Sequence, residues 1–171
     1  PNAGLDTTAI ETRAEKTGGG YVVHGRKIWT TTAGEADKIM LLARTAPRTE
    51  DTEKTAGLSL FFTDLDRRYV DVRPIPKMGR AAVDSNEVFI DGLPVPAADL
   101  IGEEGRGFEY LLHSLNPERV LVGAEAVGIG QNAIERAARY AGERIVFGRP
   151  IGQNQAIQHP LAESWIELEA A

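Results

Sequence analysis

The spacing of apolar residues changes near residue 102, and this change sets the kind of fold that the chain can adopt. Before it, short runs rich in β-branched and aromatic residues lie between turn residues, as in residues 38–44 and 70–75. After it, apolar residues recur at helical spacing, beginning with Phe108 and Leu111. Strands that are followed by helices, without alternation, predict an α+β fold with segregated parts.

The first part of the chain, residues 1–100, predicts one domain built as an antiparallel β-sandwich or β-barrel. Its strand-like segments are short and closely spaced, with no helical stretch of about ten residues between them. Turn residues are clustered at 18–20 and 91–92, and residues 45–55 read as a polar loop. The expected strands are residues 21–24, 27–32, 38–44, 57–63, 70–75 and 86–90.

The second part, residues 101–171, predicts long helices joined as an αα-hairpin. Asn116 is a favourable N-cap and Pro117 is tolerated at the first helical position, so we expect a new helix to start there. A further helix is expected from about residue 154 to the last residue. Such a hairpin leaves apolar faces uncovered, as in half of a helical bundle. We therefore expect a piece of a longer protein that oligomerises when isolated.

The composition excludes several classes of function. The chain has 171 residues, no cysteine and a formal net charge of −6. The lack of thiols rules out a Cys nucleophile and disulfides, and it fits a reducing compartment, so we expect a cytoplasmic protein. The acidic balance argues against nucleic-acid binding, and no segment has the roughly 20 apolar residues that cross a membrane. His24, His113 and His159 are not spaced as metal ligands, so no metal site is predicted.

Several motifs that carry chemistry also have simpler interpretations. Residues 128–133 match the G-x-G-x-x-A dinucleotide pattern, yet they lie within an expected helix, where small residues more often allow close helix packing. Glu118 and Glu125 are seven residues apart on one helix face, and either could be a general base. A structural role remains open for both, since an acidic residue in a first helical turn complements the macrodipole. Trp29, at a strand end, could simply pack its ring against the edge of the sheet.

An ordered set of motifs resembles the flavin-dependent acyl-CoA dehydrogenases. The motifs are PNAGLD (1–6), GRKIWTTTA (25–33), MGRA (78–81), EVFIDGLPVP (87–96), LIGEEGRGF (100–108), ERV (118–120) and ERIVFGRPIGQNQAIQH (143–159). They keep their order over nearly the whole chain. The resemblance implies the family's antiparallel β-barrel middle domain at 1–100, followed at 101–171 by the first helices of its C-terminal four-helix bundle.

The resemblance also implies FAD as cofactor and assigns residues to it. The family's strand end against the flavin, where an indole shields the isoalloxazine ring and a hydroxyl reaches its N5, corresponds to Trp29, Thr30 and Thr31. The family's segment for the flavin diphosphate and adenosine, usually those of a neighbouring subunit, corresponds to Arg144, Phe147 and Gln155. An arginine fork suits a diphosphate.

Catalysis in this family removes the α proton of an acyl-CoA with a glutamate while the β hydrogen leaves as hydride to flavin N5, giving a 2-enoyl-CoA. The isovaleryl- and long-chain-like members carry this glutamate directly before an arginine at the start of the long bundle helix, which matches Glu118 and Arg119. Other members carry it on a later helix. Asn116 and Arg119 would lie beside the acyl-CoA, and Glu125 then has a structural role. Leu5 departs from the family's usual Ser, which helps to hold the acyl-CoA.

The resemblance further implies an electron-transferring flavoprotein as electron acceptor and a homotetramer or homodimer. Two alternatives stay open. One is an oxygen-reacting relative, such as an acyl-CoA oxidase or a flavin monooxygenase component. The other is a non-catalytic binding or assembly module with the same fold, which co-purification of FAD would argue against.

Overall fold

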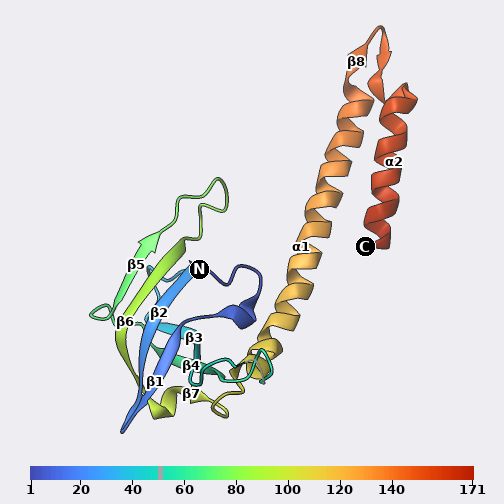
Figure 1. The fold of residues 1–171 in the computed structure, drawn as a ribbon. Coiled ribbons are helices and arrows are strands. Elements are labelled where there is room, and N and C mark those ends of the chain that lie inside the picture. Colours follow the sequence, from blue (N-terminus) through green and yellow to red (C-terminus); the bar gives the residue numbers. More distant parts are fainter. Residues whose placement is uncertain (50–51) are drawn as a thin grey trace. The chain divides into compact units, whose positions relative to one another are not determined.

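The computed structural model describes residues 1–49 and 52–171 and contains two compact units, Pro1–His113 and Ser114–Ala171. The first unit holds the main sheet, and the second holds a helical hairpin (Figure 1). The elements in chain order are η1 (Thr7–Ala9), β1 (Arg13–Thr17), β2 (Gly20–Thr31), β3 (Lys38–Arg44), β4 (Leu58–Asp64), β5 (Val70–Pro74), β6 (Ser85–Pro96), η2 (Ala97–Asp99), β7 (Leu100–Ile101), α1 (Gly107–Glu143), β8 (Ile145–Val146), β9 (Arg149–Pro150), η3 (Ile151–Gln153) and α2 (Gln155–Ala170).

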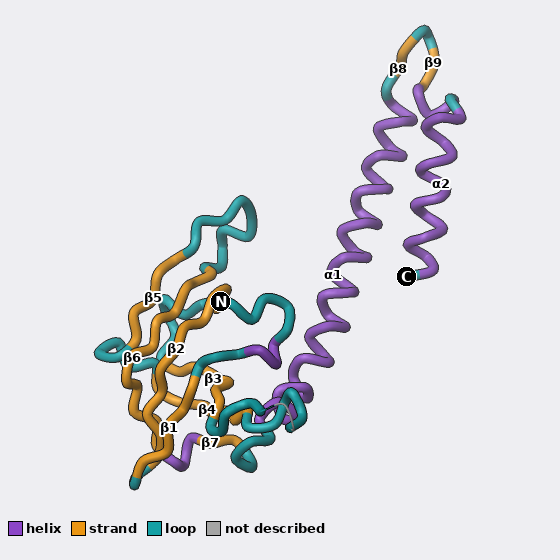
Figure 2. The backbone as a smooth tube through the Cα atoms, in the orientation of Figure 1, coloured by secondary structure: helices purple, strands orange, loops and turns teal. Residues whose placement is uncertain are grey.

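The first unit is built on one seven-stranded sheet with the order β5-β6-β2-β1-β3-β4-β7 (Figure 2). The neighbouring strands pair antiparallel, except that β1 and β3 run parallel through Arg13 and Arg44. The predicted α+β class, with strands first and helices after, is confirmed. The one parallel pair, β1 with β3, is a local departure from the antiparallel pairing that the sequence predicts.

The core of the first unit lies on one face of the strongly curved sheet. Alternate side chains of its strands are almost fully buried there, and Tyr21 meets Phe61 edge-on with ring centroids 4.9 Å apart. A second, smaller cluster joins Leu42, Leu58 and Leu60 to the first turns of α1 through Phe108 and Leu111. The start of α1 is therefore docked on β4.

The strand predictions succeed where burial alternates and fail where the chain is irregular. Residues 38–44 form β3 as expected, whereas segments 21–24 and 27–32 are one continuous strand, β2. The expected turn at 91–92 is wrong, because β6 continues through it and Gly92, at φ 72°, is the extra residue where its pairing with β2 shifts register. Strand β1 was not expected, since its sequence RAEKT is mostly charged. Of the loop predicted at 45–55, residues 50–51 lie outside the described residues.

The expected helix restart at Asn116-Pro117 is also wrong. Helix α1 runs without interruption from Gly107 to Glu143 with Pro117 inside it. Proline in a helix interior removes one backbone hydrogen bond. The helix nevertheless continues, because the turns of α1 on both sides of Pro117 keep their own hydrogen bonds. The side chain of Asn116 does not cap a helix here; its Oδ1 accepts a hydrogen bond from Arg119 Nη1 at 3.0 Å.

The second unit packs α1 against α2 through a small residue. A Cβ atom at Gly130 would lie 2.7 Å from Leu168 Cδ2 of α2, whereas one at Gly128 would have nothing within 4 Å. The G-x-G-x-x-A stretch therefore lies inside a helix, as expected, and at Gly130 it serves close helix packing. Helix α2 begins after Asn154, as predicted. Within the described residues, no helix is long and apolar enough to cross a membrane.

Candidate functional site

The end of β2 turns the Trp29 ring outward. Trp29 has a left-handed backbone with φ 62°, and its side chain is 61% exposed. The pairing of β2 with β6 shifts register between Lys27 and Thr30, so Trp29 sits at a bulge. A left-handed conformation costs an L-residue on the order of 1–2 kcal/mol, which the surrounding pairs must offset. The result is a large, flat apolar surface presented beside Thr30 and Thr31.

Asn86 and Asp84 hold this bulge in place, and sequence reasoning did not identify them. Asn86 is only 1% exposed, and its Nδ2 donates to the Thr30 carbonyl at 3.1 Å and to Asp84 Oδ2 at 2.8 Å. The Gly34 amide also donates to Asp84 Oδ2, at 3.2 Å. These donors, the Asn86 amide first, lower the pKa of Asp84, so the carboxylate stays charged. The available signal was an Asn, a poor strand former, at the start of an expected strand.

The N-terminal segment presents Leu5 to solvent. Gly4 has φ 56°, and the Leu5 side chain is fully exposed. The following turn, η1, is fixed by Asp6, whose Oδ1 accepts from the Thr8 amide at 3.0 Å. At this position the chain therefore offers an apolar side chain, where the family often offers a hydroxyl.

In the second unit, a short β-hairpin, β8 and β9 with a two-residue turn, connects the two helices. Phe147 and Gly148 both have positive φ, 52° and 79°, which is the geometry of a tight hairpin turn. The Phe147 side chain is fully exposed at the tip. Arg144 lies at the start of the hairpin, and Gln155 is the first residue of α2. The Ile151 amide donates to the Arg144 carbonyl at 2.9 Å, which brings these residues to one end of the unit.

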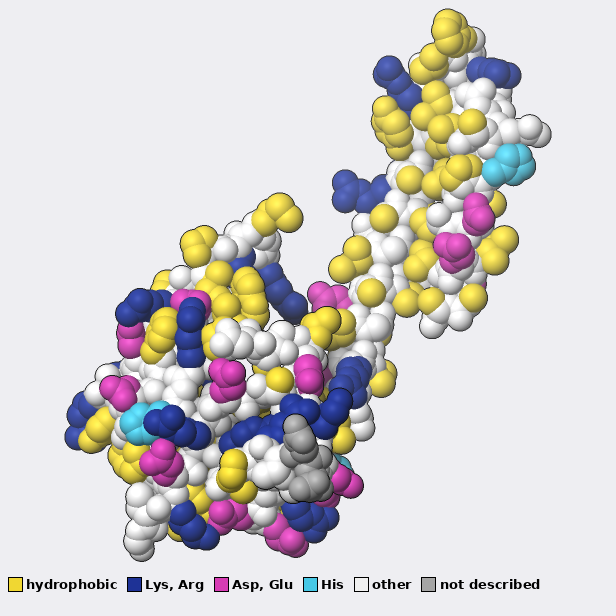
Figure 3. Space-filling model, in the orientation of Figure 1, with side chains coloured by type: hydrophobic (Ala, Val, Ile, Leu, Met, Phe, Trp, Pro, Cys, Tyr) yellow, Lys and Arg dark blue, Asp and Glu magenta, His cyan; other side chains and the backbone are white. Residues whose placement is uncertain are grey.

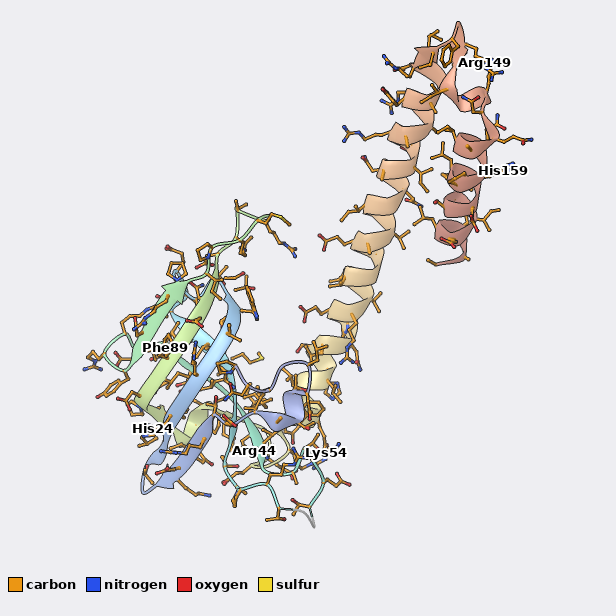
Figure 4. The ribbon with its side chains drawn as sticks, turned by 45° about the horizontal axis from the view of Figure 1, so that its top comes forward. His24, Arg44, Lys54, Phe89, Arg149 and His159 are labelled. Carbon is orange, nitrogen blue, oxygen red and sulfur yellow. The ribbon has the colours of Figure 1, made fainter. Side chains whose placement is uncertain are left out.

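The base of the hairpin is held by a side-chain contact. Arg149 Nη2 donates to Asn154 Oδ1 at 3.0 Å, and the Asn154 carbonyl accepts from the amides of Ile157 and Gln158 in the first turn of α2. Figure 4 shows Arg149 at this end and His159 further along α2. The three residues assigned to the cofactor's diphosphate and adenosine, Arg144, Phe147 and Gln155, are thus exposed around one rigid turn.

Glu118 lies inside α1, 11 residues after its first residue, Gly107, and far from this turn. It is exposed, one residue after Pro117, and its neighbours Asn116 and Arg119 are joined by the 3.0 Å hydrogen bond. Glu118 precedes the helix end at Glu143 by 25 residues, or about 38 Å of helical rise. Within one chain, the structure therefore does not bring Glu118 together with Arg144, Phe147 and Gln155.

The described parts of the chain contain no cluster of potential metal ligands. No group of three or more His, Cys, Asp or Glu side chains in residues 1–49 and 52–171 is placed to hold an ion. His24 instead lies against Asp91, with Nδ1 and Oδ1 3.1 Å apart, and accepts a hydrogen bond from the Gly92 amide. This histidine bridges the bulge where β2 meets β6.

Comparison with known proteins relates both units to one family. Residues 1–93 match the model of the acyl-CoA dehydrogenase middle domain, and residues 105–171 match that of the acyl-CoA dehydrogenase C-terminal domain. The chain therefore belongs to the acyl-CoA dehydrogenase family, a family of oxidoreductases.

Curated relatives and solved structures agree over almost the full length of the chain. The cyclohex-1-ene-1-carbonyl-CoA dehydrogenase of Syntrophus aciditrophicus is 38% identical over 172 residues, covering 100% of this chain and 41% of that protein. The benzylmalonyl-CoA dehydrogenase of Aromatoleum aromaticum is 42% identical over 173 residues, covering 100% and 44%. The FAD complex of PigA superposes with a TM-score of 0.90 at 28% identity, covering 99% of this chain and 44% of that one. The chain thus spans less than half the length of these relatives.

Proposed function

We propose that the protein to which this chain belongs oxidises an acyl-CoA thioester to a 2-enoyl-CoA with the help of FAD. The observation that carries the proposal is the exposed Trp29 ring, held in a costly conformation by Asn86 beside two threonine hydroxyls. Strain that a fold maintains at an exposed position is typical of a binding site. A planar apolar surface with adjacent hydroxyls fits an isoalloxazine ring, and an exposed guanidinium fits a diphosphate.

FAD, when bound, supplies the acceptor for the β hydrogen, which leaves as hydride. The residues of this chain have separate tasks. Trp29 covers one face of the ring and excludes water, and Thr30 or Thr31 donates a hydrogen bond at the ring edge. Glu118 removes the α proton, which is weakly acidic, so the thioester carbonyl must be polarised by fixed donors. Arg119 fixes the side chain of Asn116, on the other side of Glu118, through the hydrogen bond that it donates to Asn116 Oδ1.

The distance along α1 supports an assembly of several copies. Glu118 and the Arg144 end are about 38 Å apart along the helix, so we propose that Arg144, Phe147 and Gln155 hold the FAD of a neighbouring subunit in a homodimer or homotetramer. Figure 3 shows hydrophobic side chains along the helices of the second unit. They include exposed Val120, Leu121, Ile129, Trp165 and Ile166. Further helices or subunits are expected to cover them.

We also propose the organisation in which this function resides. Residues 1–100 form the middle domain and residues 101–171 the first helices of the C-terminal domain, and the family matches at 1–93 and 105–171 support a boundary near residue 100. An electron-transferring flavoprotein would accept the electrons. We place the enzyme in the cytoplasm and in fatty acid metabolism, and the absence of cysteine fits that compartment.

The test uses the full-length protein with its flavin, mixed without oxygen with a panel of acyl-CoAs. We expect the wild type to lose its oxidised-flavin absorbance. Glu125→Gln should lose it too, whereas Glu118→Gln should not, with FAD bound in both variants. Reduction that persists in Glu118→Gln would move the base to another residue. No reduction by any acyl-CoA would contradict the proposed reaction, and rapid reoxidation by air would assign the protein to the oxygen-reacting relatives.

A further inference from the structure

Lys27 spans a gap in the sheet. Strand β1 begins at Arg13, which pairs with His24 on β2 and with Arg44 on β3. Beyond Arg13, β1 no longer separates β2 from β3. The Lys27 side chain crosses this space, and its Nζ donates a hydrogen bond to the Leu42 carbonyl of β3 at 2.6 Å.

Lys27 is also one of the residues that line a pocket of about 550 Å³. Its wall includes Lys27 and Ile28 from β2, Ile10 and Thr12 from the segment before β1, and the first residues of the chain, 1–4. Lys27 therefore borders a cavity that a small molecule can enter, while its amino group is held at the Leu42 carbonyl. A lysine on an open surface would instead sample many positions in water.

The charges around this pocket are paired with one another and not with Lys27. Arg13, His24 and Arg26 line the pocket and lie against the carboxylates of Glu15, Asp91 and Glu87. Glu11, the acidic residue of the lining, accepts from Asn2 Nδ2 at 3.4 Å. Burial alone lowers the pKa of Lys27 to about 8, because removal from water disfavours the ammonium form.

We infer that Lys27 is a site of covalent self-acylation by acyl thioesters. The neutral Nζ attacks the thioester carbonyl carbon, and a C–N bond forms as the C–S bond breaks. The leaving thiolate takes up a proton equivalent to the one that the amine releases, so an amide and a free thiol are formed and nothing is oxidised or reduced. The inference rests on the proposed function only in that an acyl-CoA enzyme meets thioesters at high local concentration.

Two other lysines in the same unit serve as internal controls. Lys16 bonds to Glu104 at 2.7 Å and Lys38 to Asp64 at 2.5 Å, and these hydrogen bonds to carboxylates raise the pKa of both amines. At pH 7.5 the neutral fraction of an amine with a pKa near 8 exceeds that of an ordinary lysine by on the order of 100-fold. Acylation of Lys27 should therefore exceed that of Lys16 and Lys38 at least about tenfold, after allowance for its lower intrinsic nucleophilicity.

The experiment incubates the full-length, FAD-loaded protein with acetyl-CoA and measures acetylation of each lysine by peptide mass spectrometry from pH 7 to pH 10. Acetyl-CoA has no β carbon and cannot be dehydrogenated, so the result does not depend on the proposed reaction. We expect Lys27 to react first and its rate to level off above pH 8, while Lys16 and Lys38 continue to accelerate. In Lys27→Arg, which keeps a donor for the Leu42 carbonyl, the fast acetylation should be lost.

Acetylation of Lys27 no faster than that of Lys16 and Lys38 would overturn the inference. The inference would also be overturned if acetic anhydride modified Lys27 first and acetyl-CoA did not modify it, because the amine would then be reactive but inaccessible to a CoA thioester. Fast acetylation that persists in Lys27→Arg would likewise overturn it, by assigning the reactive amine elsewhere.

Discussion

Replacement of Gly107 by Ala tests how α1 is attached to the sheet. Gly107 is the first residue of α1 and is buried. A Cβ atom there would lie 2.3 Å from Leu60 N and 2.5 Å from the Ser59 carbonyl carbon. Both are backbone atoms of β4, which is paired with β3 on one side and with β7 on the other. Neither neighbour can rotate away, so the helix itself must shift.

The expected loss of stability follows from two opposing contributions. Overpacking a well-filled site costs about 1–3 kcal/mol, and contact with fixed backbone atoms places Gly107→Ala at the upper end of that range. Helix propensity returns up to about 1 kcal/mol, which leaves a net loss of about 2 kcal/mol. If a unit the size of this chain unfolds cooperatively, that loss lowers its midpoint of thermal unfolding by on the order of 5 °C, and a larger cooperative unit gives a proportionally smaller shift.

The assay compares thermal unfolding midpoints of the full-length wild type, Gly107→Ala and the control Gly18→Ala at one scan rate. A Cβ atom at Gly18 meets nothing within 4 Å, so the control should stay within about 0.5 kcal/mol of the wild type. A midpoint for Gly107→Ala equal to or above that of the wild type would refute the close docking of α1 on β4.

Two further predictions concern the ends of the first unit's strands. Trp29→Gly should relieve the left-handed strain and leave the apoprotein as stable as wild type or more so by about 1 kcal/mol, while FAD titration shows weaker binding; unchanged FAD affinity would contradict a role for the ring. Hydrogen bonds from Lys16 first, and also from Tyr21, lower the pKa of Glu104 below its ordinary value of 4.5. The charged carboxylate therefore stabilises the fold at neutral pH and stops doing so as the pH falls through its folded-state pKa. The difference in thermal unfolding midpoint between wild type and Glu104→Gln should shrink between pH 7 and pH 3. A difference that stays constant would argue against a stabilising role for the contacts of Glu104 with Lys16 and Tyr21.

Regular elements of this fold could be predicted from the sequence because burial imposes a period on them. Strand β3 begins with alternating exposed and buried residues and continues with three buried ones, residues 41–43, and its limits were predicted as residues 38–44. Helix α2 was predicted to begin at about residue 154 and begins at Gln155, although the side chain of Asn154 makes no capping hydrogen bond to it. In both cases the local residue preferences and the tertiary contacts favour the same structure.

Irregular features could not be predicted, because contacts distant in sequence decide them. Pro117 is a local signal for a helix start, but the turns of α1 on either side of it outweigh that signal. At Gly92 the pairing of β6 with β2 converts an expected turn into a bulge.

The candidate site divides in the same way. The motif resemblance assigned Trp29 and Arg144 to the proposed flavin site, whereas periodicity alone would have left the Trp29 ring as packing at the sheet edge. Asn86, which supports Trp29 from a neighbouring strand, and Lys27, whose burial depends on the gap beside β1, carry no local signal of their roles. Such roles emerge only when strands from separate parts of the sequence are assembled.

The uninterrupted course of α1 through Pro117 leaves one backbone carbonyl of the helix without its usual partner. Proline has no amide hydrogen to offer the carbonyl of His113, four residues earlier, so the helix lacks one hydrogen bond in the turn before Glu118. Helices bend most readily where such a hydrogen bond is missing. Glu118 is one residue beyond Pro117, and a bend of about 10° displaces its backbone by a fraction of an ångström. The far end of the helix at Glu143 is a lever arm of about 39 Å and sweeps roughly 7 Å for the same bend. The proposed base thus lies where such a bend would displace the backbone of α1 least, and the Phe147 hairpin lies beyond the end where it would displace it most.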